Sequence, residues 1–225
     1  MPSYSGIFTL QAQMQAIAAG TWTGLPLVIG QAYEGGFYAG QISTAGNGIA
    51  DYNLVIGPLS TAQSQLSWKN ANTATTGSDS DIDGPQNTAD MVADGSSTVY
   101  PAAHFCNNLT IGGYTDWYMP SKNEMELCYY NLKPTTSNNS TTVGINPNAV
   151  PARASNYTSG IPAQTLSTDF QTSGSEAFDG SGVYYWSSTE FSATAGGKQR
   201  FAYGTQGGSN KNYSLRVRSV RRVAV

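Results

Sequence analysis

Three aspartates and a glycine stand in a pattern that could bind a metal ion. Asp79, Asp81 and Asp83 alternate along "DSDIDGPQNTAD", and Gly84 follows them, as at the start of a loop that wraps a calcium ion. Alternate side-chain oxygens can surround the ion because the glycine permits a sharp turn. Asp90 takes the twelfth position, where such loops prefer the longer glutamate. The stretch predicts a calcium site, and an acidic surface turn without metal is the alternative.

Side chains that serve as nucleophiles or general bases are scarce in the chain. His104 is its only histidine and falls on the polar side of a predicted helix, where a surface histidine is expected. Cys106 and Cys128 fall on the apolar stripes of two predicted helices, where free cysteines act as small hydrophobic side chains. A disulfide bond between Cys106 and Cys128 remains the alternative. No GxSxG, HExxH or P-loop pattern occurs, so we expect a protein that is not an enzyme.

Charge is sparse in this chain of 225 residues. Charged residues make up 11% of it and the net charge is −3, so we expect no binding to nucleic acid. No run approaches the ~20 apolar residues that a membrane-spanning helix needs, and we expect no membrane insertion. Four basic residues crowd the last ten positions and predict a solvated or inter-subunit face: Arg216, Arg218, Arg221 and Arg222.

Strand patterns stand near both ends of the chain. Residues 34–42 and 51–59 are typical of two strands joined by a hairpin loop that contains glycine. Strand-like runs return at 183–189, 198–205 and 214–223, and the alternation of the last slips near Ser219, which indicates a bulge or a strand end. Strands, then helices, then strands predict an α+β domain whose terminal strands pair.

Helix signals fall in the middle of the chain. Pro101 begins an apolar stripe that runs to Leu109, which predicts a helix. Ser121 and Glu124 form a capping box at the start of a second helix. The turn and aromatic residues just before it, including Trp117, are therefore expected to be a structural corner of the fold.

Three further segments remain. Two of them lack clear strand or helix patterns, and the third precedes the main domain. Residues 71–94 are polar and predict a loop. Residues 134–182 form a long stretch poor in apolar side chains, which is typical of a functional or disordered loop. Residues 1–30 contain a short uncharged helix pattern that would be marginal alone, so we expect it to attach the domain of residues 31–225 to a partner or to pack on the domain itself.

Several motifs together resemble a known family. They are "GGYTDWYMPSKNEMELCYYNL", then "YYWSSTE", "QRFAYG" and a closing "VRSVRRV". This set is similar to the Lcl-type domain, also called DUF1566, over roughly residues 35–225. The resemblance implies a C-type-lectin-like α+β fold with a twisted antiparallel sheet, two main helices and long loops. Where the family commonly has "DWRLP", this chain has "DWYMP" and lacks that arginine.

The same resemblance suggests a function. The family is related to formylglycine-generating enzymes, which use two late reactive cysteines, and to phage tropism determinants. Both cysteines here come early, so that oxidase activity is not expected. The opening segment resembles those of tailed-phage virion proteins. We therefore expect a non-enzymatic virion-surface protein, a homo-oligomer that contacts other virion proteins through residues 1–30.

Two roles on the virion stay open. One is an adhesin of a tail fibre or tail tip that recognises a glycan or protein on the host surface, and the other is a structural decoration of the capsid or tail. The EPN, QPD and WND signatures of calcium-dependent sugar binding are missing, so a glycan would bind by another route. By analogy with the phage proteins, the late strands and loops present the ligand-binding residues: Tyr184, Glu190, Phe191, Gln199, Arg200, Tyr203, Asn210, Asn212 and Tyr213. Calcium is the one cofactor that the sequence suggests.

Overall fold

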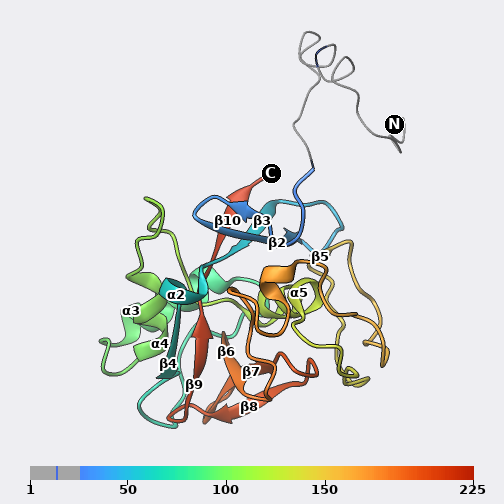
Figure 1. Cartoon of the computed structure of the whole chain (residues 1–225). Coiled ribbons are helices and arrows are strands. Elements are labelled where there is room, and N and C mark those ends of the chain that lie inside the picture. The colour runs from blue at the N-terminus through green and yellow to red at the C-terminus, as the bar shows by residue number, and fades with distance from the viewer. Residues whose placement is uncertain (1–13, 15–25) are drawn as a thin grey trace.

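The computed structural model of the chain describes Met14 and residues 26–225. The helix and attachment segment expected in residues 1–30 therefore fall mostly outside the described residues. From residue 26 onward the chain forms an α+β domain with two β-sheets, which confirms the predicted fold class (Figure 1). No helix in the described part of the chain is long and apolar enough to cross a membrane.

The first sheet joins strands from both ends of the domain. Its members are β1 (Ala32–Tyr33), β2 (Gly36–Ile42), β3 (Tyr52–Ile56), β5 (Ala149–Val150) and β10 (Val220–Ala224). They run in the order β1-β2-β3-β10, with β5 paired to β2, and every pair is antiparallel. β2 and β3 form the predicted hairpin. The pairing of β3 with β10 confirms that the terminal strands meet.

The structure contains a second sheet, whereas the family resemblance led us to expect a single twisted antiparallel sheet. Its members are β4 (Gln63–Ser67), β9 (Ser214–Arg218), β6 (Tyr184–Ser192), β7 (Ala195–Arg200) and β8 (Gln206–Asn210), in the order β4-β9-β6-β7-β8. All neighbours are antiparallel except β6 and β9, which are parallel. The last predicted strand is thus two strands, because β9 ends at Arg218 and β10 begins at Val220 in the other sheet.

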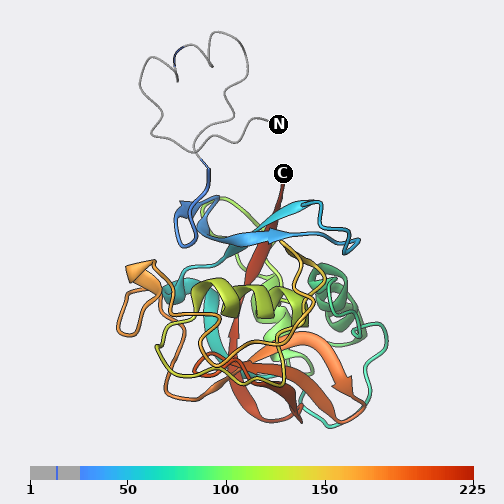
Figure 2. The same cartoon turned by 90° about the vertical axis from the view of Figure 1, so that its right-hand side faces the viewer.

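Helices pack on both faces of the second sheet. They are α2 (Leu59–Ala62), α3 (Gly84–Asp94), α4 (Pro101–Asn107), α5 (Lys122–Leu132) and the short 3-10 helix η1 (Thr168–Phe170). Figures 1 and 2 show α5 between the two sheets, and Figure 1 shows α3 and α4 beside β4 and β9. Strand alternation in β6 serves both sides: Tyr185 enters the core under α5, and Trp186 enters the core under α3 and α4.

Helix α3 corrects the prediction that residues 71–94 are all loop. Asp83 accepts a hydrogen bond from the Gln86 amide at 3.2 Å as the N-cap, and Pro85 takes a first-turn position. The helix was missed because its buried face is largely polar: Asn87 and Thr88 are buried beside Met91. Asn87 is satisfied there, since its Nδ2 donates to the Ser80 carbonyl at 2.7 Å. A periodicity test for apolar residues does not detect such a face.

The start of α5 confirms the predicted capping box. Glu124 Oε2 accepts a hydrogen bond from the Ser121 amide at 2.8 Å. Trp117 is buried, as predicted, and its Nε1 donates to the Tyr114 carbonyl at 3.2 Å. The corner before α5 is therefore structural.

The long segment 134–182 is packed against the core. It contributes Tyr157, Phe170 and Phe178 to the cluster under α5, and all three are buried. Phe178 stacks on Phe201 with ring centroids 3.7 Å apart. Three widely spaced aromatic side chains thus anchor a stretch that is otherwise rich in hydroxyl and amide groups, and buried amides such as Asn139 and Asn146 add hydrogen bonds to the core.

The four late arginines correct the prediction of a solvated or inter-subunit face. Each forms an ion pair inside the domain, with N–O distances of 2.7 to 2.8 Å: Arg216 with Asp179, Arg218 with Glu176, Arg221 with Asp116 and Arg222 with Glu124. Arg218 has no exposed surface, and burial lowers its pKa to about 10 against the opposing effect of Glu176. The acidic partners come from three separate parts of the chain, the corner at Asp116, helix α5 and the segment that contains Glu176 and Asp179, so β9 and β10 hold those parts together.

Arg222 and Glu124 are the centre of a buried polar group. Glu124 is fully buried and also accepts a hydrogen bond from the Tyr118 hydroxyl. Burial acts to lower the pKa of Arg222, but Glu124, Tyr118 and Asp83 together outweigh it and raise that pKa. Burial and the Glu124 carboxylate together raise the pKa of Tyr118 well above its usual value.

We predict that Glu124→Gln destabilises the domain by about 3–5 kcal/mol, because it leaves the Arg222 guanidinium buried without its counter-charge. Asp81→Asn is the matched control: it breaks the exposed Lys122–Asp81 pair and should cost less than about 1 kcal/mol. Urea unfolding followed by circular dichroism measures both. Equal losses in the two variants would contradict the central role of Glu124.

Candidate functional site

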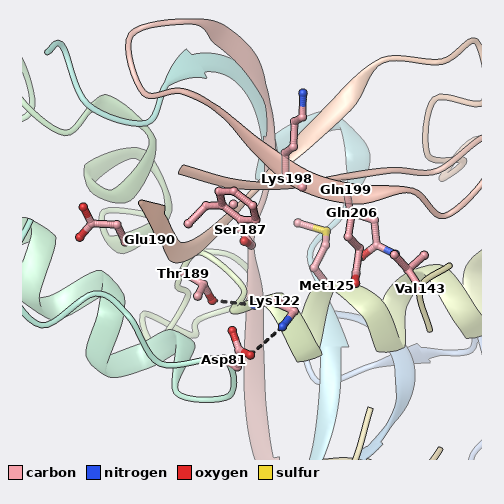
Figure 3. A pocket seen from close by; sticks show the side chains of 13 residues that line it. Asp81, Lys122, Met125, Val143, Ser187, Thr189, Glu190, Lys198, Gln199 and Gln206 are labelled. Atoms are coloured by element: carbon pink, nitrogen blue, oxygen red, sulfur yellow. Dashed lines mark hydrogen bonds and ion pairs between the residues drawn. The ribbon is translucent and has the colours of Figure 1, made fainter. Parts of the chain in front are cut away.

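A groove lies between the N-terminal end of α5 and the strands β6, β7 and β8. It has a volume of about 370 Å³, within the range of small-ligand pockets. The residues that line it include Asp81, Lys122, Met125, Val143, Thr189, Glu190, Phe191, Gln199 and Gln206. Figure 3 shows Gln199 and Gln206 pointing toward Met125 and Val143, whereas Lys198 on the same strand points away.

The floor of the groove holds two side-chain amides. Gln199 and Gln206 are directly opposite each other in the β7–β8 pair. Gln206 Nε2 donates to Gln199 Oε1 at 3.5 Å, and Gln199 Nε2 donates to the Gly204 carbonyl at 3.5 Å. Both distances lie at the outer limit of a hydrogen bond, so these bonds are weak. The amides therefore keep hydrogen-bonding capacity that a ligand could use.

One rim of the groove is fixed by the start of α5. Lys122 Nζ pairs with Asp81 at 2.7 Å, and the Lys122 amide donates to Thr189 Oγ1 at 2.9 Å. Thr189 Oγ1 in turn donates to the Ser80 carbonyl at 2.8 Å. The loop before α3, the helix α5 and the strand β6 are thus tied together at this rim.

Phe191 forms the other rim and is the most exposed aromatic side chain of the groove, at 64%. Its ring packs on the backbone of β8 because Gly208 has no side chain: a Cβ at Gly208 would lie 2.4 Å from Phe191 Cδ1. The glycine therefore sets the position of the ring. An exposed, fixed aromatic ring is a common platform for stacking on a ligand.

Glu190 lines the groove, but its carboxylate is already engaged. Glu190 Oε1 pairs with Lys211 Nζ at 2.7 Å, and both carboxylate oxygens accept from the Thr75 amide. Lys211 has no exposed surface, and burial lowers its pKa although Glu190 opposes that shift. The pair holds the loop that contains Thr75 against the end of β6.

The nine ligand-binding residues that the sequence predicted divide among three places. Glu190, Phe191 and Gln199 line the groove. Tyr184, Arg200 and Tyr203 lie on the other face of the sheet, where the Arg200 guanidinium stands 4.4 Å from the centre of the Tyr184 ring. Asn210, Asn212 and Tyr213 are exposed at the turn between β8 and β9. The structure brings together only the first three around a hollow.

Sequence reasoning missed Gln206, Met125 and Val143. A signal existed for Gln206, because a hairpin read from "KQRFAYGTQGG" places it opposite Gln199. Met125 falls in the helix predicted to begin after Ser121, and it is buried. Val143 comes from the long segment 134–182, where no local pattern predicts a position in space.

The four aspartates of the predicted calcium loop do not converge. Asp83 is the N-cap of α3, Asp81 pairs with Lys122, Asp90 Oδ1 accepts from Gln86 Nε2 at 2.8 Å, and Asp79 is exposed. Among the residues that the structure describes, no group of three His, Cys, Asp or Glu side chains could hold a metal ion. Calcium binding stays a prediction that would require the loop to rearrange.

The histidine and the two cysteines lie away from the groove. Of the described residues that line it, none is a histidine or a cysteine. His104 Nε2 is hydrogen-bonded to the Gly95 carbonyl at 2.7 Å, away from the groove. Cys106 and Cys128 are free and buried in two different core clusters. Burial raises the pKa of the Cys106 thiol to about 12, and it also raises that of Cys128, so both are inert core side chains.

Comparison with models of known protein families identifies the family of the chain. Residues 59–221 match the model of the Lcl C-terminal domain, so the chain belongs to this family, as its motifs indicated. The match covers α2 to β9 and the first residues of β10, and it therefore includes the whole groove. No curated protein matches the chain.

We predict that calcium stabilises the domain only slightly, because the ion would have to displace the present partners of Asp81, Asp83 and Asp90. At a calcium concentration equal to its dissociation constant the gain is about 0.4 kcal/mol, or roughly 1 °C in Tm. Differential scanning fluorimetry with millimolar calcium or EDTA measures the shift. A rise of several degrees that Asp83→Asn abolishes would instead support the calcium loop.

Proposed function

We propose that this protein is a non-enzymatic recognition protein on the surface of a tailed-phage virion, and that its groove binds a ligand on the host cell. The observation that carries the proposal is the groove itself: two loosely bonded amides, two apolar side chains and an exposed aromatic ring face one hollow. Such a set binds polar organic ligands, and the lining carboxylates of Asp81 and Glu190 are already engaged in ion pairs with Lys122 and Lys211.

The phage setting is supported by the sequence of the opening segment and by the relation of the family to tropism determinants. In this proposal, residues 1–30 attach a homo-oligomer to other virion proteins, and the domain points outward. A C-type-lectin-like fold is part of the same proposal. It is supported by paired terminal strands, two largely antiparallel sheets around a central helix and long irregular segments packed on them.

We predict that Phe191→Ala and Gln206→Ala each weaken binding to host cells about tenfold or more, as for truncated side chains at the centre of an interface. Fluorescently labelled protein and flow cytometry on host strains measure the binding. Leu166→Ala is the matched control, because it removes an apolar side chain that is 96% exposed and lies outside the groove.

Antibody–gold labelling of intact particles tests the location. Label at the tail tip or fibres together with loss of cell binding in the groove variants would support the proposal. Protein that binds no cells and labels the head would instead make it a decoration protein. Unchanged cell binding by both groove variants would contradict the groove as the recognition site.

We further predict that Gly208→Ala weakens cell binding nearly as much as Phe191→Ala, although the aromatic ring is retained. The new Cβ would lie 2.4 Å from Phe191 Cδ1 and must push the ring from the rim. Gly160→Ala is the control, because a Cβ there meets nothing within 4 Å. Normal cell binding by Gly208→Ala would show that the position of the ring is unimportant.

A further inference from the structure

We propose that the groove binds an N-acetylated amino sugar and recognises it by its acetamido group. The inference rests on the proposed function, since it names the chemical class of the ligand. An acetamido group presents one N–H donor, one carbonyl acceptor and a methyl group close together. The groove presents the complement of each.

The two glutamines match the polar part of the acetamido group. Gln199 is only 1% exposed, and its amide can form several hydrogen bonds. Within the described residues its side-chain partners are the Gly204 carbonyl and Gln206 Nε2, both at 3.5 Å. A nearly buried amide with such weak partners gains from a ligand that both accepts and donates. A secondary amide does both with one planar group.

The apolar side chains match the rest of the sugar. Met125 and Val143 lie across the groove from the glutamines, as Figure 3 shows, and offer a dry contact for the acetyl methyl group. The Phe191 ring at the rim can stack on the apolar face of the hexose. One sugar residue thereby contacts the floor, the far wall and the rim.

The charges around the groove favour a neutral ligand. Lys122 is paired with Asp81, and Glu190 with Lys211, each at 2.7 Å. Lys198 points away from the hollow and donates to Ser209 Oγ at 2.6 Å on the other face of the sheet. Of the lysines among the described lining residues, Lys198 alone lacks a carboxylate partner, and its ammonium lies on the other face of the sheet. A carboxylate or phosphate in the hollow would therefore meet no free cation there, whereas an uncharged acetamido group needs none.

Matched sugars isolate the acetamido group. The methyl glycosides of N-acetylglucosamine, N-acetylgalactosamine and N-acetylmannosamine are compared with those of glucose, galactose and mannose, by isothermal titration and saturation-transfer NMR on the full chain. We expect at least one N-acetyl sugar to bind about tenfold or more tightly than its parent sugar, because the parent leaves the amides unpaired. The strongest NMR transfer should fall on the acetyl methyl protons.

Variants assign the binding to the groove. Gln199→Glu and Gln206→Glu replace an amide that donates by a carboxylate that only accepts, and each should reduce binding of the N-acetyl sugar about tenfold. Gln206 is half-exposed, so its variant tests the proposal even if Gln199→Glu fails to fold. Gln65→Glu, at an exposed position of β4, is the control and should bind normally.

The outcomes separate this inference from the proposed function. Equal binding of N-acetyl and parent sugars, or no binding of any N-acetyl sugar while Phe191→Ala still abolishes cell binding, overturns the acetamido inference alone. Binding of an N-acetyl sugar that both glutamine variants retain also overturns it. Groove variants that leave cell binding unchanged overturn the proposed function instead.

Discussion

The ion pair between Glu124 and Arg222 is the interaction on which the rest of the domain depends. Glu124 belongs to the helix between the sheets, and Arg222 to a strand that follows directly on a strand of the other sheet. Since Glu124 also caps α5 and holds Tyr118, one buried carboxylate orients helix, sheet and corner together. A wrong packing of α5 would leave a charge buried without a partner, which costs several kcal/mol.

What the sequence predicted correctly is local. The β2–β3 hairpin, the capping box of α5 and the end of a strand at Ser219 each follow from neighbouring residues, whose conformations depend on short-range sterics and hydrogen bonds. Alternation in β6 likewise separated Tyr185 from Trp186. The pairing of β3 with β10 was also anticipated, because strand patterns stand near both ends of an α+β chain.

What the sequence did not reveal depends on contacts between distant residues. From the sequence, the arginines of β9 and β10 were expected to be solvated at the end of the chain. Only the fold shows that their acidic partners lie up to about a hundred positions away. The same holds for the groove. Gln199 was selected with residues from the opposite face of its sheet, since alternation tells which side chains share a face but not which face lines a hollow.

The stability of the core and the chemistry of the groove are physically linked. Gln199 and Gln206 stand on a strand pair, Met125 stands on α5, and the bond from the Lys122 amide to Thr189 of β6 ties α5 to the sheet of that pair, while Arg222 ties α5 to the other sheet. A groove built on such rigid elements loses little conformational entropy when a ligand enters, so a few modest contacts can give useful affinity. For ligand binding, the placement of the Gln199 and Gln206 amides and of the Phe191 ring then matters more than the low charge of the surface. Recognition by neutral groups is consistent with a chain in which most lysine and arginine side chains are engaged inside the fold.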